Sequence, residues 1–476
     1  MTRKVSRARR RQIIDALGRG TVPQNGLDLF AVGLERFEKV LDEELTATAS
    51  GRSGFKAIRG EYGSGKTFFA RWLAERAKRM RMATSEIQIS DTQTPLHRLE
   101  TVYRALIGGL STASSPPSAL REIVDTWLLT LEDDANAAEG IAKDDRPAME
   151  PAVEELIESR LAEAAQTAPA FATALRFYRR ARLAGDQATA DGLLAWVGGE
   201  PNVAAGVRRY ANIKGDLDSG NVYGFLQGLL VVLRDCGHPG LLVVLDEIET
   251  LQRMRRDSRE RSLNTLRQLI DEIDKGRFPG LHLVITGTPA FYDGQQGVQQ
   301  LTPLAQRLAT DFDTDARFDT ARAVQIRLTG FDQDKLVQLG CAVRDLYAEG
   351  NPAEARIRSL VDDGYIKDLA GAVAGRLGVG TAPRTFLRKL VADVLYRVAD
   401  HEDFDPRRHY RLTISDTELN DDERNAARGT TRNAARGTAG STARGTARST
   451  AGGTGHGTAR GMRHPLSADE VELDLT

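Results

Sequence analysis

Short apolar runs rich in β-branched residues alternate along the chain with longer segments in which apolar residues recur at helical spacing. Five such runs predict strands, at Phe55–Arg59, Glu86–Ser90, Leu241–Leu245, Leu281–Thr286 and Val324–Leu328. Strands that alternate with helices are typical of a parallel sheet whose two faces are both covered. The pattern therefore predicts an α/β protein built on a parallel sheet sandwiched by helices.

The helical segments differ greatly in length. Two amphipathic stretches lie within residues 11–46, before the first predicted strand. The interval between the second and third strands holds one helical pattern after another, and we interpret about 95–240 as a large helical insertion. The pattern is helical again from residue 331 to about residue 400, which predicts a C-terminal helical domain.

The last part of the chain differs in composition. Residues 425–463 consist almost entirely of Ala, Arg, Gly, Thr, Asn and Ser. A segment without branched or aromatic apolar residues cannot bury enough surface to offset its ordering entropy, so we predict that it is disordered. Its positive charge would allow a transient contact with a phosphate backbone, but a low-complexity insert without function is the reading we favour.

Size and charge limit the function classes. The chain has 476 residues, too many for one compact core, and a formal net charge of −1, which gives no overall attraction to nucleic acid. The two cysteines, Cys236 and Cys341, lie far apart and indicate neither a disulfide framework nor a zinc site. No apolar run reaches the roughly 18 residues of a membrane span, and no signal-peptide core follows the basic N-terminus. We therefore expect a soluble, cytoplasmic protein without membrane contact.

The sequence GEYGSGKT, residues 60–67, has the spacing of a phosphate-binding loop. It lies between the first predicted strand and a predicted helix at Thr67–Lys78, a context that disfavours a chance glycine turn. Small residues let backbone N–H groups curl around a phosphate, and the helix dipole points at the same charge. Lys66 would reach the β and γ phosphates, and the Thr67 hydroxyl would bind Mg²⁺. The predicted nucleotide-binding residues are Gly60, Glu61, Tyr62, Gly63, Ser64, Gly65, Lys66, Thr67 and Phe68.

Two adjacent carboxylates end the third predicted strand, in LLVVLDEIE at residues 241–249. Asp246 would hold Mg²⁺ directly or through water, and Glu247 would polarise the attacking water. An acidic helix cap after an apolar strand is the alternative. Because the pair follows a phosphate-binding loop in the right order, the two motifs together predict hydrolysis of ATP with Mg²⁺.

Three further residues are candidates for the same site. Thr286 ends the fourth predicted strand and, ahead of Thr288, could sense the γ phosphate; a strand running into a turn is the alternative. Arg384 lies in the first turn of a helix, where a cation opposes the helix dipole, so we expect it to serve an anion. Arg307 could act on a neighbouring subunit, although we slightly favour a solvated surface arginine.

These motifs, in this order, resemble those of the AAA+ ATPases, in particular the origin-recognition-like branch. The resemblance implies a P-loop NTPase core with a helical lid, a polar sensor at Thr286 and a second sensor at Arg384. It also implies that Val22 and Pro23, in the stretch TVPQNGLDLFAVG, lie near the adenine. The large helical insertion departs from a minimal AAA+ module and leaves the partner surface open.

Longer stretches resemble the BrxD-type ATP-binding proteins of bacterial BREX phage-defence systems, over about residues 10–415. They are GLDLFAVGLERFEKVLDEEL, FKAIRGEYGSGKTFFARWLAERA, ISDTQTPLHRLETVYRALI and APRTFLRKLVADVL. The resemblance implies an accessory ATPase that acts on DNA with other defence proteins, and AAA+ proteins commonly complete their sites between subunits of a homo-oligomer. We accordingly expect an N-terminal helical segment (1–50), a P-loop ATPase core (51–330), a helical lid (331–415) and a mostly disordered tail (416–476).

Two functions compete on this basis. A DNA-associated motor or switch is suggested by the arginine-rich segments RKVSRARRRQ (3–12) and LQRMRRDSRERSLNTLRQL (251–269), although a solvated helix face explains each equally well. The alternative is a signalling NTPase that acts through protein partners, with the helical insertion as its binding surface. A kinase-like transferase is the weakest reading, because no acceptor pocket is recognisable and a strand ending in Asp-Glu fits hydrolysis better.

Overall fold

A computed structural model describes residues 6–142, 144–377 and 383–414 of the chain. The tail, including the segment expected to be disordered, lies outside the described residues. All described residues belong to one compact unit. No helix in this part of the chain is long and apolar enough to cross a membrane.

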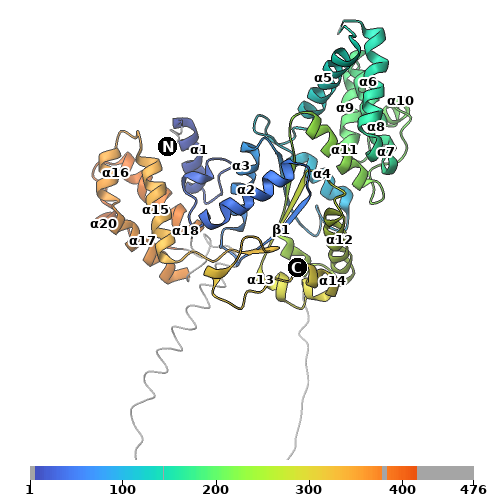
Figure 1. Ribbon diagram of the computed structural model, residues 1–476. Coiled ribbons are helices and arrows are strands. Elements are labelled where there is room, and N and C mark those ends of the chain that lie inside the picture. Colours follow the sequence, from blue (N-terminus) through green and yellow to red (C-terminus); the bar gives the residue numbers. More distant parts are fainter. Residues whose placement is uncertain (1–5, 143, 378–382, 415–476) are drawn as a thin grey trace, which may run out of the picture. The chain divides into compact units, whose positions relative to one another are not determined.

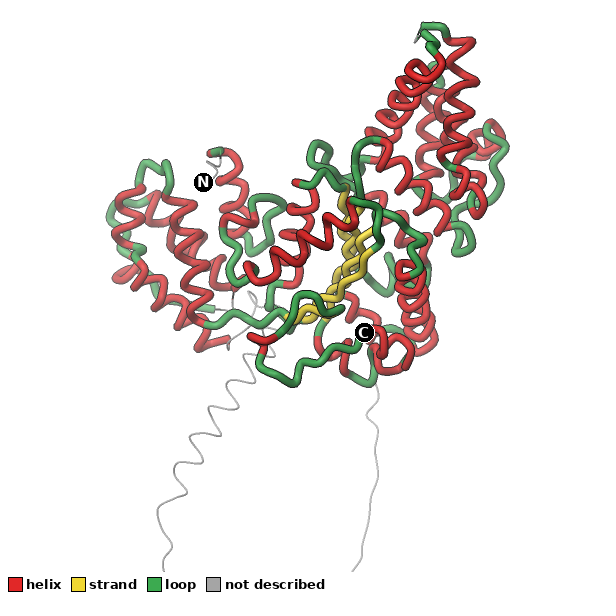
Figure 2. Tube along the Cα trace, in the orientation of Figure 1, coloured by secondary structure: helices red, strands yellow, loops and turns green. Residues whose placement is uncertain are grey.

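Five parallel strands form one sheet in the order β2-β3-β4-β1-β5. Figure 2 shows these strands side by side, with helices on either side of them. This arrangement confirms the predicted α/β class with a parallel sheet sandwiched by helices. The strands are β1 (Gly54–Arg59), β2 (Ala83–Gln88), β3 (Leu241–Asp246), β4 (Leu281–Gly287) and β5 (Gln325–Arg327).

The predicted bounds of β2 are wrong by three residues at its start. The strand begins at Ala83, which pairs with Leu241 of β3, and it ends at Gln88 beside Asp246. Thr84 and Ser85 are buried. Because both are polar, the apolar pattern of the sequence did not indicate that the strand begins before them. The correction matters for function, because it moves Gln88 from mid-strand to the carboxyl end of the sheet.

Alternation along the strands divides the buried side chains into two clusters. In β3, Leu241, Val243 and Leu245 belong to one cluster, and Leu242 and Val244 belong to the other. Side chains two apart share a face of a sheet, so a continuous apolar strand buries both of its faces.

From the helical insertion, α4 (Leu99–Gly109) packs against β2 on the first face, and the insertion also carries its own aromatic core. Trp127, Trp196, Phe171 and Phe225 are all fully buried there. Helix α12 (Arg256–Asp274) and the short helices α13 (Pro289–Asp293) and α14 (Thr302–Arg307) pack on the same side. The helices between β2 and β3 are α4 (Leu99–Gly109), α5 (Leu120–Glu139), α6 (Arg146–Arg160), α7 (Ala162–Thr167), α8 (Pro169–Leu183), α9 (Gln187–Val197), α10 (Ala205–Tyr210) and α11 (Val222–Asp235) (Figure 1).

The second face is covered by α2 (Glu35–Ala49) and α3 (Lys66–Arg79), close to the helix predicted at Thr67–Lys78. Helix α1 (Arg7–Gly18) packs against the C-terminal helices, where the Tyr396 hydroxyl donates to Asp15 Oδ1 at 3.1 Å. The C-terminal helices are α15 (Gln333–Ala348), α16 (Glu354–Leu360), α17 (Asp363–Leu377), α18 (Pro383–Arg388), a π-helical stretch (Lys389–Leu395), α19 (Tyr396–Asp400) and α20 (Pro406–His409). Short 3₁₀ helices lie at Leu27–Leu29, Ile248–Arg253, Val298–Gln300 and Ala316–Phe318.

Candidate functional site

The loop from Gly60 to Lys66, here called the phosphate loop, joins β1 to α3. A Cβ atom at Gly60 would collide with Ser64 Oγ and lie 3.3 Å from the Leu328 side chain, so a larger residue would require the Ser64 side chain to move. Gly65, which caps α3, has a φ of 92°, in the left-handed region that favours glycine. The loop thus combines small residues and a left-handed glycine with the start of a helix, the features of anion-binding loops.

The Lys66 side chain is folded into the phosphate loop. Its ammonium group donates to the carbonyl oxygen of Gly60 at 2.9 Å and to that of Glu61 at 3.4 Å. It also lies 4.9 Å from the centre of the Tyr62 ring. The side chain is only 8% exposed, so a cation is held at the position where a phosphate would bind.

Asp246, Thr67 and Thr286 meet at the carboxyl end of the sheet. The Thr67 hydroxyl donates to Asp246 Oδ2 at 2.9 Å, and the Thr286 hydroxyl donates to Asp246 Oδ1. Asp246 and Thr286 are buried. Three separate elements, α3, β3 and β4, thus bring together the residues that the sequence assigned to metal binding and sensing.

The oxygen ligands at this end of the sheet suit a Mg²⁺ ion that is shared with nucleotide phosphates. No group of three or more His, Cys, Asp or Glu in the described part of the chain could hold a metal ion alone. Mg²⁺ keeps several waters and is commonly held by one or two protein oxygens together with substrate phosphates. The Asp246 carboxylate and the Thr67 hydroxyl would supply those oxygens.

Glu247 follows in an unusual backbone conformation. Its φ is 59°, in the left-handed region that non-glycine residues seldom adopt. Its backbone N–H donates to Asp246 Oδ1 at 3.0 Å, and its carboxylate accepts a hydrogen bond of 2.8 Å from Gln88 Nε2. The side chain is exposed at the site. Gln88 was missed in the sequence because the misplaced second strand put it away from the strand end.

Glu249 is the third acidic residue of the motif LDEIE, and the sequence analysis gave it no role. It is 5% exposed, and its carboxylate lies 3.7 Å from the Lys66 ammonium. Burial raises the pKa of Glu249 above its ordinary value, and the charge of Lys66 opposes that rise. Its position in the motif LDEIE was the only sequence signal for it.

A cavity of about 300 Å³, here called the nucleotide cavity, opens beside the phosphate loop. Lys66, Asp246, Glu247 and Glu249 line it, with Lys66 3.7 Å from Glu249 and Glu247 bonded through its N–H to Asp246. The rest of its wall comes from the N-terminal segment and the C-terminal helices, and includes Val22, Pro23, Phe30, Lys335, Leu339, Pro383, Arg384 and Leu387. The size and mixed lining are those of a small-molecule site.

The remaining predicted residues divide into two groups. Val22, Pro23 and Arg384 line the nucleotide cavity, and Arg384 Nε donates to the carbonyl oxygen of Gly20 at 3.1 Å. Arg307 does not line the cavity, and it forms ion pairs with Asp271 and Asp274 of α12 at 2.5 and 3.1 Å. A role for Arg307 across a subunit interface stays a prediction.

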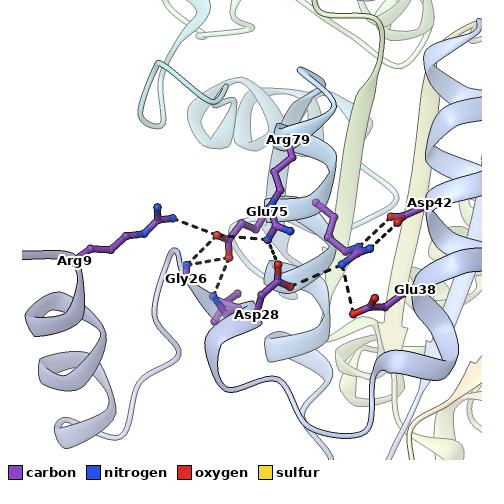
Figure 3. Close-up of polar contacts among 9 residues, drawn as sticks. Arg9, Gly26, Asp28, Glu38, Asp42, Glu75 and Arg79 are labelled. Atoms are coloured by element: carbon purple, nitrogen blue, oxygen red, sulfur yellow. Dashed lines mark hydrogen bonds and ion pairs between the residues drawn. The ribbon is translucent and has the colours of Figure 1, made fainter. Parts of the chain in front are cut away.

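Glu75 of α3 fastens the N-terminal segment to the core (Figure 3). Its Oε2 atom accepts hydrogen bonds from the backbone N–H groups of Gly26 and Leu27, each at 2.9 Å, and Oε1 pairs with Arg9 at 3.2 Å. Neighbouring ion pairs join Arg79 to Asp28, Arg76 to Asp42 and Arg76 to Glu38. The stretch that carries Val22 and Pro23 is therefore anchored to the helix that begins in the phosphate loop.

Replacing Glu75 by alanine is expected to lower the free energy of unfolding by about 2 kcal/mol and to weaken ATP binding, since two backbone N–H groups lose a charged acceptor. Urea denaturation and calorimetric titration would measure the two effects. The matched control is Glu38→Gln, which breaks a pair at 3.6 Å whose carboxylate side chain is 44% exposed. That control should cost less than about 1 kcal/mol, and equal losses in both variants would contradict the anchoring role.

The sheet order, the phosphate loop after β1 and the carboxylate at the end of β3, with β4 between these two strands, together define a P-loop ATP-binding protein with added helical regions. The chain belongs to the BREX system ATP-binding protein BrxC/D family, which matches residues 5–414. This confirms the family resemblance seen in the sequence, and ATP is accordingly the ligand expected in the nucleotide cavity. No curated protein matches the chain.

Proposed function

We propose that the protein hydrolyses ATP with Mg²⁺ and uses the reaction as a DNA-associated motor or switch. The observation that carries the hydrolysis is the contact between Thr67 and Asp246 at 2.9 Å, with Glu247 next to it at the nucleotide cavity. Mg²⁺ held there would neutralise charge on the β and γ phosphates. In this reaction a water oxygen bonds to the γ phosphorus, and the bond from that phosphorus to the β–γ bridging oxygen breaks.

Each residue has a defined task in this proposal. Lys66 binds the β and γ phosphates, and Glu247 accepts a hydrogen bond from the attacking water and draws off its proton. Thr286 holds the Asp246 carboxylate in place through its hydroxyl. Arg384 reaches the phosphates from the C-terminal helices when it leaves Gly20.

Of the two arginine-rich segments, the one after β3 is better suited to bind DNA. In the N-terminal segment, Arg9 and Arg10 pair with Glu75 and Glu349, whereas Arg11 only approaches Asp15 at 3.9 Å and Arg7 is exposed without an ion pair in the part of the chain that the structure describes. By contrast, Arg253, Arg255 and Arg256 are exposed, and none of the three forms an ion pair within the described residues. This basic turn, defined as residues 253–256, follows Glu247 and Glu249 within a few residues and is free to contact a phosphate backbone.

Duplex DNA is expected to stimulate the ATPase rate, and the stimulation should weaken steeply as salt concentration rises. The triple change Arg253→Gln, Arg255→Gln and Arg256→Gln should reduce the salt dependence of DNA binding by about 0.9 in log–log slope per lost contact. The matched control is Arg7→Gln with Arg11→Gln, which removes arginines from the N-terminal segment. Equal binding by the triple variant and the wild type would contradict the basic turn as the contact.

A signalling NTPase remains the second candidate, because large apolar side chains are exposed on the helical insertion. Leu129 of α5 is 62% exposed and Tyr210 of α10 is 42% exposed. Exposed apolar residues of this size are typical of surfaces that bind other proteins when they gather in a patch. Absence of any DNA stimulation, with activity that depends instead on a protein partner, would favour this function.

A further inference from the structure

Glu249 is a buried carboxylate inside the nucleotide cavity with no hydrogen bond to either oxygen. Its side chain is 6% exposed, and both Oε1 and Oε2 are buried without a hydrogen-bond donor. Burying a carboxylate in this way is costly unless a cation compensates for it. The cation that lies nearest is the Lys66 ammonium, at 3.7 Å.

Lys66 is in turn surrounded by oxygen atoms of the protein. An ammonium group has three donors, and those of Lys66 face the carbonyl oxygens of Gly60 and Glu61 and the carboxylate of Glu249. Asp246 and Glu247 line the same cavity. A triphosphate that binds must therefore compete with these oxygens for the Lys66 ammonium. It is also repelled by the carboxylates that line the cavity.

We propose that Glu249 is the internal counter-ion of Lys66 and sets the affinity of the site for nucleotide polyphosphates. Glu249 positions the ammonium group within the phosphate loop before nucleotide binds, and a bound triphosphate takes the ammonium from it. The bound state then leaves Glu249 beside negative phosphates. This competition weakens binding of ATP and ADP and speeds the release of ADP. Glu249 acts through Lys66 and is a positioning residue rather than a catalytic one.

Glu249→Gln tests the proposal, because it removes the charge with little change of shape. Calorimetric titration with ATP, and separately with ADP, in EDTA without Mg²⁺ should show a dissociation constant about ten-fold lower than that of the wild type, equivalent to about 1.4 kcal/mol. Release of ADP should slow correspondingly. Glu249→Asp, which keeps the charge, should restore affinity toward the wild-type value. Affinity that is unchanged or weaker in Glu249→Gln would overturn the proposal, since a purely structural role predicts weaker binding in both variants.

A second measurement needs no nucleotide. Lys66→Gln should lower the melting temperature of the free protein, because it leaves Glu249 buried without its cation. Adding Glu249→Gln to that variant should recover at least half of the loss, and a further loss in the double variant would contradict the pairing. The inference rests on the proposed nucleotide site, but its readouts are binding and stability. A protein that binds ATP without hydrolysing it would overturn the proposed hydrolysis and leave this inference standing.

Discussion

Lys66→Ala is expected to weaken ATP binding by about 100-fold or more, equivalent to roughly 2.7 kcal/mol or more. The residue supplies the cation inside the phosphate loop, and the adjacent walls of the cavity carry Asp246, Glu247 and Glu249. Without Lys66, a triphosphate would meet three carboxylates in the cavity. Calorimetric titration with ATP in the presence of Mg²⁺ would measure the loss.

The matched control for this variant is Lys78→Ala. Lys78 lies on the same helix, α3, but does not line the nucleotide cavity. A general effect of removing a lysine from this helix would appear in both variants, whereas loss of a phosphate contact would appear only in Lys66→Ala. Unchanged ATP affinity in Lys66→Ala would show that the nucleotide binds elsewhere.

The residues whose location could be predicted from the sequence are those that follow from one strand and the turn after it. The phosphate loop is a local motif, so the spacing of Gly60, Lys66 and Thr67 fixes how they lie relative to β1 and α3. Asp246 could be placed because parallel strands end at the same edge of a sheet. Its contact with Thr67 follows from the phosphate-loop motif, from the acidic end of β3, and from the rule that parallel strands end at the same edge of a sheet.

The residues that the sequence missed depend on register between strands. Gln88 reaches Glu247 only because β2 is paired so that Gln88 lies beside Asp246. The apolar pattern favoured a strand that begins later, since Thr84 and Ser85 are polar although the fold buries them. A shift of a few residues in one strand was enough to hide the side chain that holds the Glu247 carboxylate.

Ion pairs between residues that lie far apart in the sequence could not be predicted either. The N-terminal arginines resemble a basic patch in the sequence, but Arg9 and Arg10 meet Glu75 and Glu349 in the fold. Arg307 likewise meets Asp271 and Asp274, more than thirty residues earlier in the chain. Whether a basic residue is available to an outside anion is decided by tertiary packing, so composition alone left both questions open.

Glu247→Gln is expected to keep ATP binding near the wild-type level and to slow turnover by about 100-fold or more, the usual contribution of a general base. The amide keeps the shape of the side chain and its hydrogen bond to Gln88, but it cannot draw a proton from water. Calorimetric titration and the rate of phosphate release would measure binding and turnover separately.

The comparison with Glu249→Gln makes this prediction specific. Both changes remove one negative charge from the lining of the nucleotide cavity, so any effect of charge alone on phosphate binding should appear in both. Glu247 is exposed at the cavity and accepts its hydrogen bond from Gln88, whereas Glu249 is buried against Lys66. Loss of the hydrolysis step with retained affinity should therefore belong to Glu247→Gln, and tighter binding of ATP and ADP with slower release of ADP should belong to Glu249→Gln. Wild-type turnover in Glu247→Gln would remove that residue from the chemistry.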